Sequence, residues 1–176
     1  KEINGPGIVH EGDGFRVRAF PLRHSKPCYG YCLEESGRPG TFHPEKAREF
    51  GVPEGPLWAR LQAGDSVDLQ DGSKVDSASV LGAPRSGRKF SYVTDTLYLD
   101  SIAPEVRDSD LLICEGMFAD ELEESAREKK HLTAKQAATI ARDAGGVKKL
   151  GLIHYSPRYT ERDLSRLLQE AHSLFP

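Results

Sequence analysis

The chain has 176 residues, of which 24 are basic and 27 acidic, so its formal net charge is −3. This length suits one domain, or a large part of one, with a hydrophobic core. The net charge excludes a protein that is basic as a whole. Basic residues gather only locally, at 85–89 and 127–130, where a solvated face is a commoner explanation than a nucleic-acid-binding patch. The three cysteines do not have the number or spacing of a disulfide framework, which favours a reducing compartment. The sequence has no signal-peptide pattern and no run of eighteen apolar residues, so we predict a soluble cytoplasmic protein.

The first elements in chain order are two predicted strands. Residues 14–22 alternate between apolar side chains and arginines, which is typical of a half-buried strand. His24 follows this strand directly. Residues 29–33 predict a second strand, antiparallel to the first across a turn at Lys26 and Pro27.

Residues 34–64 differ in composition, because glycines and prolines recur through the whole segment. They leave room only for short helices at 44–50 and 56–61, whose prolines suit the first helical turn, where no N–H is needed. We therefore predict an inserted flexible arm. Trp58, the only tryptophan, is either a contact residue or an anchor that holds the arm together, and the second role is favoured.

The middle of the chain predicts short strands. Residues 66–69 and 74–75 form a hairpin around Asp71-Gly72. Strands at 80–81 and 89–93 follow, and then at most a short helix at 101–107.

The second half alternates strands with helices, which indicates an α/β fold. Thr133 and Gln136 have the spacing of a capping box, and a glycine pair ends the helix that they open. Leu164, Leu167, Leu168 and Ala171 predict the apolar stripe of the last helix. The expected elements are strands at 110–114 and 150–153, and helices at 120–130, 134–144 and 161–172.

Five polar residues lie at or near predicted element ends and could form a site: His24, Asp95, Glu115, His131 and His154. Ligands in open α/β sheets bind beyond the carboxyl ends of the strands. Imidazole and carboxylate groups suit zinc, and a carboxylate has two oxygens with which to bridge two cations. Two metals ~4 Å apart can activate water and hold a phosphodiester. Each residue alone has a plainer explanation, such as a structural hydrogen bond, a loop cap or a salt bridge.

Several segments resemble, in their sequences and in their order, the C-terminal part of ribonuclease Z, the tRNA 3′-processing endonuclease family of the metallo-β-lactamase superfamily. The resemblance spans essentially the whole chain. The matching segments are residues 21–25, 28–31, 39–40, 51–57, 80–88, 94–96, 110–115, 131–133 and 154–159.

The resemblance implies the C-terminal portion of a metallo-β-lactamase αββα sandwich, spanning residues 1–176, with residues 34–64 as a tRNA-binding arm. It implies two zinc ions, or manganese, with His24 on one ion, Asp95 bridging and His154 on the other. It also implies precursor tRNA as substrate and a homodimer.

Further roles follow from the same resemblance. His131 would contact the scissile phosphate or donate a proton to the leaving oxygen, and Glu115 would orient His131. Ser156 and Arg158 would lie near a substrate phosphate. Gly55-Pro56 would be the signature of the arm.

The sequence departs from the family pattern at several points. The His-x-His-x-Asp-His motif does not occur, Thr94 stands where glycine is usual, Leu132 where serine is usual, and residues 114–117 read Cys-Glu-Gly-Met instead of His-Glu-Ala-Thr. The sequence begins without methionine. We therefore expect part of a longer chain, which alone is inactive and binds metal poorly. The alternatives are a non-catalytic RNA-binding half-domain and another phosphodiesterase of the same superfamily.

Overall fold

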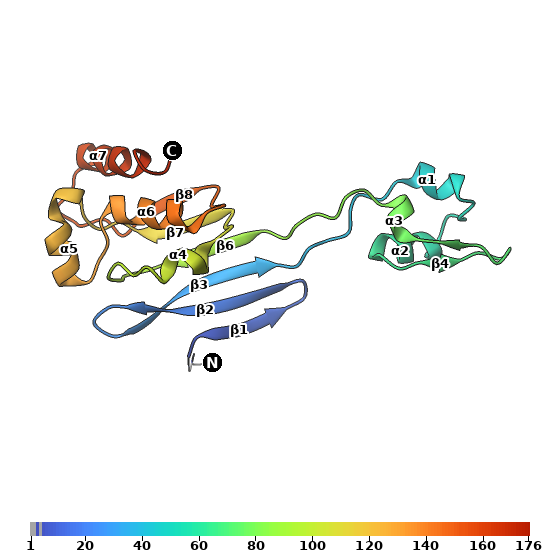
Figure 1. Ribbon diagram of the computed structural model, residues 1–176, viewed down its shortest axis with the longest axis horizontal. Coiled ribbons are helices and arrows are strands. Elements are labelled where there is room, and N and C mark those ends of the chain that lie inside the picture. The colour runs from blue at the N-terminus through green and yellow to red at the C-terminus, as the bar shows by residue number, and fades with distance from the viewer. Residues whose placement is uncertain (1–2, 4) are drawn as a thin grey trace. The chain divides into compact units, whose positions relative to one another are not determined.

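The computed structural model describes residue 3 and residues 5–176, which form two compact units (Figure 1). The first unit combines the chain up to Glu35 with Arg88–Pro176, and the second is Ser36–Gly87. In the part of the chain that the structure describes, no helix is long and apolar enough to cross a membrane.

A six-stranded mixed sheet forms the centre of the first unit, in the order β1-β2-β3-β6-β7-β8. Neighbouring strands are antiparallel from β1 to β6 and parallel from β6 to β8. Consequently β2, β6, β7 and β8 all run in the same direction and end at one edge of the sheet. The strands are β1 Gly7–Gly12, β2 Phe15–Arg23, β3 Pro27–Glu35, β6 Lys89–Val93, β7 Leu111–Glu115 and β8 Leu150–Ile153.

Helices pack on one face of this sheet. The helix α6 (Ala134–Ala144) contacts β7 and β8 and packs against α4 (Ile102–Val106) and α7 (Glu161–His172). Its first turn has the predicted capping box between Thr133 and Gln136. The largest core cluster joins sheet residues to these helices: Phe20, Cys32, Val93, Leu112 and Cys114 with Ile102, Val106, Ile140 and Ala141.

The opposite face of the sheet is also apolar. Tyr92 pairs with Tyr31 on one side and Ile113 on the other, and successive side chains of a strand point to opposite faces. Within the described residues none of these three belongs to a hydrophobic core cluster, and Phe90 in the same sheet is 37% exposed. Sheets with parallel strands are normally covered on both faces, so this face is suited to packing against a further layer of secondary structure.

The second unit has a core of its own, formed by Ala47, Val52, Leu61, Val67, Val75 and Val80. As predicted, prolines begin the two helices α1 (Pro44–Glu49) and α2 (Pro56–Ala63). The predicted hairpin is present as β4 (Val67–Asp68) and β5 (Lys74–Val75).

Trp58 anchors this unit internally. Its indole N–H donates to the carbonyl oxygen of Val52 at 3.1 Å, and its ring packs against Phe42. The guanidinium of Arg48 lies 5.2 Å from the centre of the same ring. These contacts favour the anchor interpretation of Trp58 over the contact one.

Two local predictions are wrong. Residues 80–81 are not a strand, because the Asp76 carboxylate accepts a bond from the backbone N–H of Ala78 and caps the short helix α3 (Ser77–Val80). Leu168 is 64% exposed, so the buried stripe of α7 consists of Leu167 and Ala171. In addition, residues 120–130 begin as a 3-10 turn, η1 (Asp120–Leu122), before α5 (Glu123–Lys129).

Candidate metal centre

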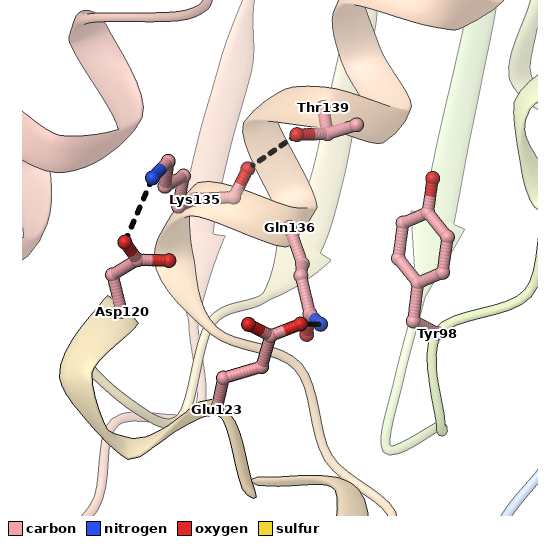
Figure 2. A pocket seen from close by; sticks show the side chains of 6 residues that line it. All are labelled: Tyr98, Asp120, Glu123, Lys135, Gln136 and Thr139. Atoms are coloured by element: carbon pink, nitrogen blue, oxygen red, sulfur yellow. Dashed lines mark hydrogen bonds and ion pairs between the residues drawn. The ribbon is translucent and has the colours of Figure 1, made fainter.

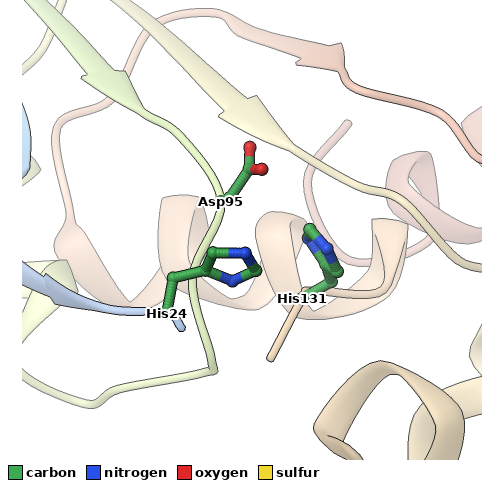
Figure 3. Close-up of side chains that lie close together, drawn as sticks. All are labelled: His24, Asp95 and His131. Carbon is green, nitrogen blue, oxygen red and sulfur yellow. The ribbon is translucent and has the colours of Figure 1, made fainter. Parts of the chain in front are cut away.

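The five candidate side chains of the sequence meet at the carboxyl-terminal edge of the sheet. His24 follows β2, Asp95 follows β6, Glu115 ends β7, and His154 follows β8; His131 lies between α5 and α6. In Figure 3 the rings of His24 and His131 lie side by side below the carboxylate of Asp95. The parallel order of the strands therefore brings together residues that are up to 130 positions apart in the sequence (154 − 24).

Two overlapping groups have ligand atoms close enough to share a metal ion. One is His24, Asp95 and His131, and the other is Glu115, His131 and His154, each with ligand atoms within 4.8 Å of one another. The ring centres of His131 lie 4.9 Å from His24 and 5.2 Å from His154. Nδ1 of His154 is 3.3 Å from Asp95 Oδ1, so the two groups form one continuous cluster.

The imidazole of His24 is oriented as a ligand would be. Its Nδ1 lies 3.0 Å from the carbonyl oxygen of Lys130, which can only accept a hydrogen bond. In the neutral imidazole, Nδ1 therefore carries the proton and Nε2 keeps its lone pair. Metal-binding histidines commonly donate their second N–H in this way. Imidazoles and carboxylates form a donor set that suits zinc. His24 and Asp95 belong to one of the two groups and His154 to the other, and both groups include His131.

Glu115 and His131 form a buried pair beside this cluster. Glu115 is fully buried, its Oε2 lies 2.9 Å from His131 Nδ1, and its Oε1 accepts a bond from the N–H of Thr96. Burial, together with the charge of Asp95, raises the pKa of Glu115 to about 8, although backbone N–H groups oppose the shift. Burial also lowers the pKa of His131. Both shifts favour an uncharged pair near neutral pH.

The raised pKa of Glu115 predicts a pH-dependent stability of the metal-free protein. Between pH 6.5 and 8 the folded protein keeps a proton on Glu115 that the unfolded chain, with a pKa near 4.5, has released. Stability should therefore fall as the pH rises through this window, by up to about 1.4 kcal/mol per pH unit. The lowered pKa of His131 opposes this loss only near pH 6.5, because the imidazole of the unfolded chain is largely deprotonated at higher pH.

Urea unfolding at pH 6.5, 7.2 and 8 measures this loss. Glu115→Gln, which cannot ionise, should show a smaller decrease than the wild type over the same range. If both proteins lose the same stability between pH 6.5 and 8, Glu115 does not hold a proton in the folded state.

Ser156 and Arg158 act as one unit. Ser156 is buried, and its backbone N–H donates to the carbonyl oxygen of Met117 at 3.1 Å. Arg158 Nε donates to the Ser156 hydroxyl oxygen at 3.2 Å, and its guanidinium lies 5.2 Å from the ring centre of Phe118. The Phe118 ring in turn meets His131 edge-on at 6.3 Å. Ser156 thus orients Arg158, and Arg158 is one aromatic ring away from the cluster.

Sequence reasoning missed two residues at this place, Phe118 and Lys129. The ammonium of Lys129 lies 5.7 Å from the centre of the Phe118 ring, so two cations share one aromatic side chain. Neither Lys129 nor Arg158 takes part in an ion pair among the described residues. The basic run 127–130 was a signal for Lys129, but Phe118 had none.

The other basic run is largely compensated. Arg88 pairs with Glu35 at 2.7 Å, and the ammonium of Lys89 donates to the carbonyl oxygens of Glu105 and Arg107. Residues 85–89 are therefore partly occupied by structural contacts.

Local contacts account for three of the residues that depart from the expected pattern, Thr94, Leu132 and Gly116. The Thr94 hydroxyl donates to Asp95 Oδ1 at 3.1 Å and helps to orient that carboxylate. Leu132 is fully buried in the main core. A Cβ on Gly116 would lie 3.2 Å from the Cα of Ala134, so a glycine suits the close approach of α6.

A hollow elsewhere on the first unit is a weaker candidate. It measures about 290 Å³ and is lined by Tyr98, Asp120, Glu123, Lys135, Gln136 and Thr139 (Figure 2). Lys135 pairs with Asp120 at 2.7 Å, and Gln136 donates to Glu123 at 3.0 Å. Several polar groups that line this hollow are therefore already bonded to one another. In the cluster at the strand ends, by contrast, the hydrogen bond of His24 uses Nδ1 and leaves Nε2 for a ligand.

Gly55 and Pro56 open helix α2 of the second unit. Gly55 has φ 137°, a conformation that favours glycine, and Pro56 occupies the first helical turn. The pair therefore forms the N-terminal end of this helix.

Comparison with known proteins gives consistent results. Residues 59–155 match the family described as "Beta-lactamase superfamily domain". Over its full 176 residues the chain is 55% identical to the Ribonuclease Z of Treponema denticola and 54% identical to that of Treponema pallidum. It is 45% identical to the Ribonuclease Z of Methanosarcina acetivorans over 99% of its residues. The chain spans about 57% of the length of the curated relatives that it matches.

Solved structures agree on the fold. YhfI from Bacillus subtilis, a metallo-beta-lactamase fold protein, aligns with 92% of this chain and 44% of its own at a TM-score of 0.55 and 20% identity. The short form of human tRNase Z aligns with 86% of this chain and 40% of its own at a TM-score of 0.51 and 23% identity.

Proposed function

The chain belongs to the beta-lactamase superfamily and is a homologue of ribonuclease Z, and on this basis we propose that it supplies the C-terminal part of a zinc-dependent endoribonuclease that removes the 3′ trailer of precursor tRNA. One observation carries the proposal. The metal-compatible residues His24, Asp95 and His154 lie at one sheet edge, and the buried Glu115–His131 pair lies directly beside them.

Each residue has a role that its contacts support. Two bound zinc ions would supply a polarised water and stabilise charge on the phosphate. His24 and His154 would each hold one ion, and Asp95 would lie between them because its carboxylate has two oxygens. The site thus needs a carboxylate where the structure has Asp95, within 3.3 Å of His154.

His131 is positioned to move a proton. Glu115 holds its Nδ1 at 2.9 Å, so the other ring nitrogen, Nε2, is not engaged by Glu115. A proton on Nε2 would pass to the 3′ oxygen of the last retained nucleotide as the phosphorus–oxygen bond breaks. The proton of the Glu115 carboxyl group would move to Nδ1 at the same time, so that His131 stays neutral and Glu115 becomes a carboxylate. The products would be a 3′-hydroxyl on the tRNA and a 5′-phosphate on the trailer.

Arg158 and Lys129 would bind phosphates of the RNA. Both cations are without an acidic partner among the described residues, and both lie over Phe118, which contacts His131. Cationic side chains provide most of the affinity for a nucleic-acid backbone. The net charge of −3 therefore does not oppose RNA binding, because the positive charge is local.

Removal of the metal tests the reaction class. The full-length protein, treated with a chelator and freed of it by dialysis, should not cleave precursor tRNA, and added zinc or manganese should restore cleavage. Cleavage that persists at an undiminished rate without metal would exclude the proposal. RNA binding without cleavage at any metal concentration would favour the non-catalytic alternative, and cleavage of small phosphodiesters alone would favour another phosphodiesterase.

The second unit is proposed as the tRNA-binding arm, with Gly55-Pro56 at its signature. Deletion of residues 36–87 tests this role, because Glu35 and Arg88 are joined by a backbone hydrogen bond of 2.8 Å and a short Gly-Ser linker can connect them. We expect affinity for precursor tRNA to fall at least about tenfold, which is ~1.4 kcal/mol. Hydrolysis of bis(p-nitrophenyl) phosphate should change little, and equal losses on both substrates would contradict the role.

Likeness to ribonuclease Z is also the ground for proposing a cytoplasmic homodimer. Light scattering of the full-length protein checks this proposal, and a mass of one chain at micromolar concentration would contradict it.

A further inference from the structure

Helix α5 ends in a turn whose backbone conformation is unusual for the residue that it contains. Lys130 has φ 60°, in the left-handed region that glycine normally occupies at helix ends. The N–H of Lys130 donates to the carbonyl oxygen of Arg127 at 3.2 Å, and the N–H of His131 donates to that of Ala126 at 2.8 Å. For a residue with a side chain this conformation costs about 1 kcal/mol.

This turn presents two consecutive groups to the candidate metal centre. The Lys130 carbonyl oxygen lies 3.0 Å from Nδ1 of His24, which belongs to the end of β2. The next side chain, His131, meets Glu115 at the end of β7. A single turn therefore fixes two imidazoles whose ring centres are 4.9 Å apart.

We propose that the left-handed turn at Lys130 positions the metal centre, because its carbonyl oxygen holds His24 in the tautomer that leaves Nε2 free for a metal ion. Lys130 is a positioning residue that acts through its backbone. The Lys130 carbonyl group is thus an orienting group in addition to the expected metal ligands. This inference rests on the proposed function only in assuming that the site binds a metal ion.

The distribution of strained residues supports the proposal. Among the described residues, only Asp108, Lys130 and His154 combine a side chain with a positive φ. Two of the three lie at the candidate centre, and such conformations persist at functional sites where the surroundings hold them. Asp108 lies between α4 and β7, at the opposite edge of the sheet. It offers a control with the same backbone conformation.

The plainer alternative is that the turn only ends the helix. In that case a change that disfavours a positive φ would cost stability and leave metal binding unchanged. The β-branched side chain of valine disfavours this region, and glycine adopts it freely. Lys130→Gly keeps the carbonyl group and its direction, so it separates the backbone from the side chain.

Zinc affinity of the full-length protein, measured by competition with a chromophoric chelator, tests the proposal. We expect Lys130→Val to bind zinc about 10- to 100-fold more weakly. Loss of a group that orients a metal ligand typically lowers metal affinity by this factor. Lys130→Gly should stay within about twofold of the wild type by the same reasoning. Asp108→Val, with φ 59° at its site, should lower the thermal unfolding temperature but not the zinc affinity.

A second readout needs no metal. Nitrogen-15 spectra of the imidazoles should show His24 protonated at Nδ1 in the wild type and in Lys130→Gly, and a tautomer mixture in Lys130→Val. Lys130→Ala, with a smaller steric conflict, gives an intermediate case if the valine variant does not fold.

Equal zinc affinities of Lys130→Val and Asp108→Val would overturn the proposal, as would a loss in Lys130→Gly as large as that in Lys130→Val. Neither measurement uses RNA, so an inactive protein would refute the proposed function without affecting this result.

Discussion

Asp95→Ala should lower cleavage of precursor tRNA by the full-length protein at least about a thousand-fold, equivalent to ~4 kcal/mol of transition-state stabilisation. Asp95 is the carboxylate of the cluster that is not buried: it is half-exposed and lies 3.3 Å from His154. Glu115 cannot replace it, because its two oxygens already contact Thr96 and His131. Without Asp95, the carboxylate left in the cluster would be Glu115, which is already bonded to Thr96 and His131.

Asp100→Ala is the matched control, since Asp100 is an exposed aspartate five residues further along the same loop. Cleavage rates and zinc content should be measured together on both variants. Asp95→Ala should lose both, and Asp100→Ala should lose neither. Undiminished cleavage by Asp95→Ala would remove Asp95 from the metal centre.

His131→Ala should lower kcat by about 10²- to 10⁴-fold, the usual contribution of a positioned proton donor. His131 is 8% exposed, and its Nδ1 is held by Glu115, so Nε2 is the nitrogen available to substrate. The variant should keep most of its zinc, because His24, Asp95 and His154 remain. KM for precursor tRNA should change much less than kcat.

His172→Ala provides the control for this substitution, because His172 is exposed at the end of α7. Single-turnover rates separate the chemical step from product release. If His131→Ala instead loses its zinc along with its activity, His131 is a metal ligand, as its place in both ligand groups would allow. An unchanged kcat would exclude both roles.

Local signals were sufficient for several elements of the fold. The strands Lys89–Val93 and Leu150–Ile153 and the helix Glu161–His172 have the predicted bounds. Each was predicted from its own residues, as a strand-forming run or as the apolar stripe of a helix. Val80 and Leu168 were mispredicted because a cap at Asp76 and the packing of α7 decided their environments.

The candidate site was predictable in its residues but not in its contacts. Strand-end positions identified His24, Asp95 and His154, and the common direction of β2, β6 and β8 explains why they meet. The carbonyl group of Lys130 and the ring of Phe118 could not be predicted in this way. Any residue supplies a carbonyl group, and only the tertiary fold brings it within 3.0 Å of His24.

The bounds of the compact second unit were also only partly predictable from the sequence. Its glycines and prolines predicted a segment distinct from the rest, at 34–64. The structure's unit continues to Gly87, because Val67, Val75 and Val80 share a core with the earlier residues Ala47, Val52 and Leu61. These contacts join residues across the hairpin, which composition alone does not reveal.

The central claim is that this chain carries the C-terminal part of a tRNA 3′-processing site. Mapping the product ends of a 5′-labelled precursor tRNA, cut by the full-length protein with zinc or manganese, tests it most directly. We expect one cut after the discriminator base, with a 3′-hydroxyl on the tRNA and a 5′-phosphate on the trailer. Scattered cuts, a 3′-phosphate on the tRNA, or no cut with either metal would contradict it.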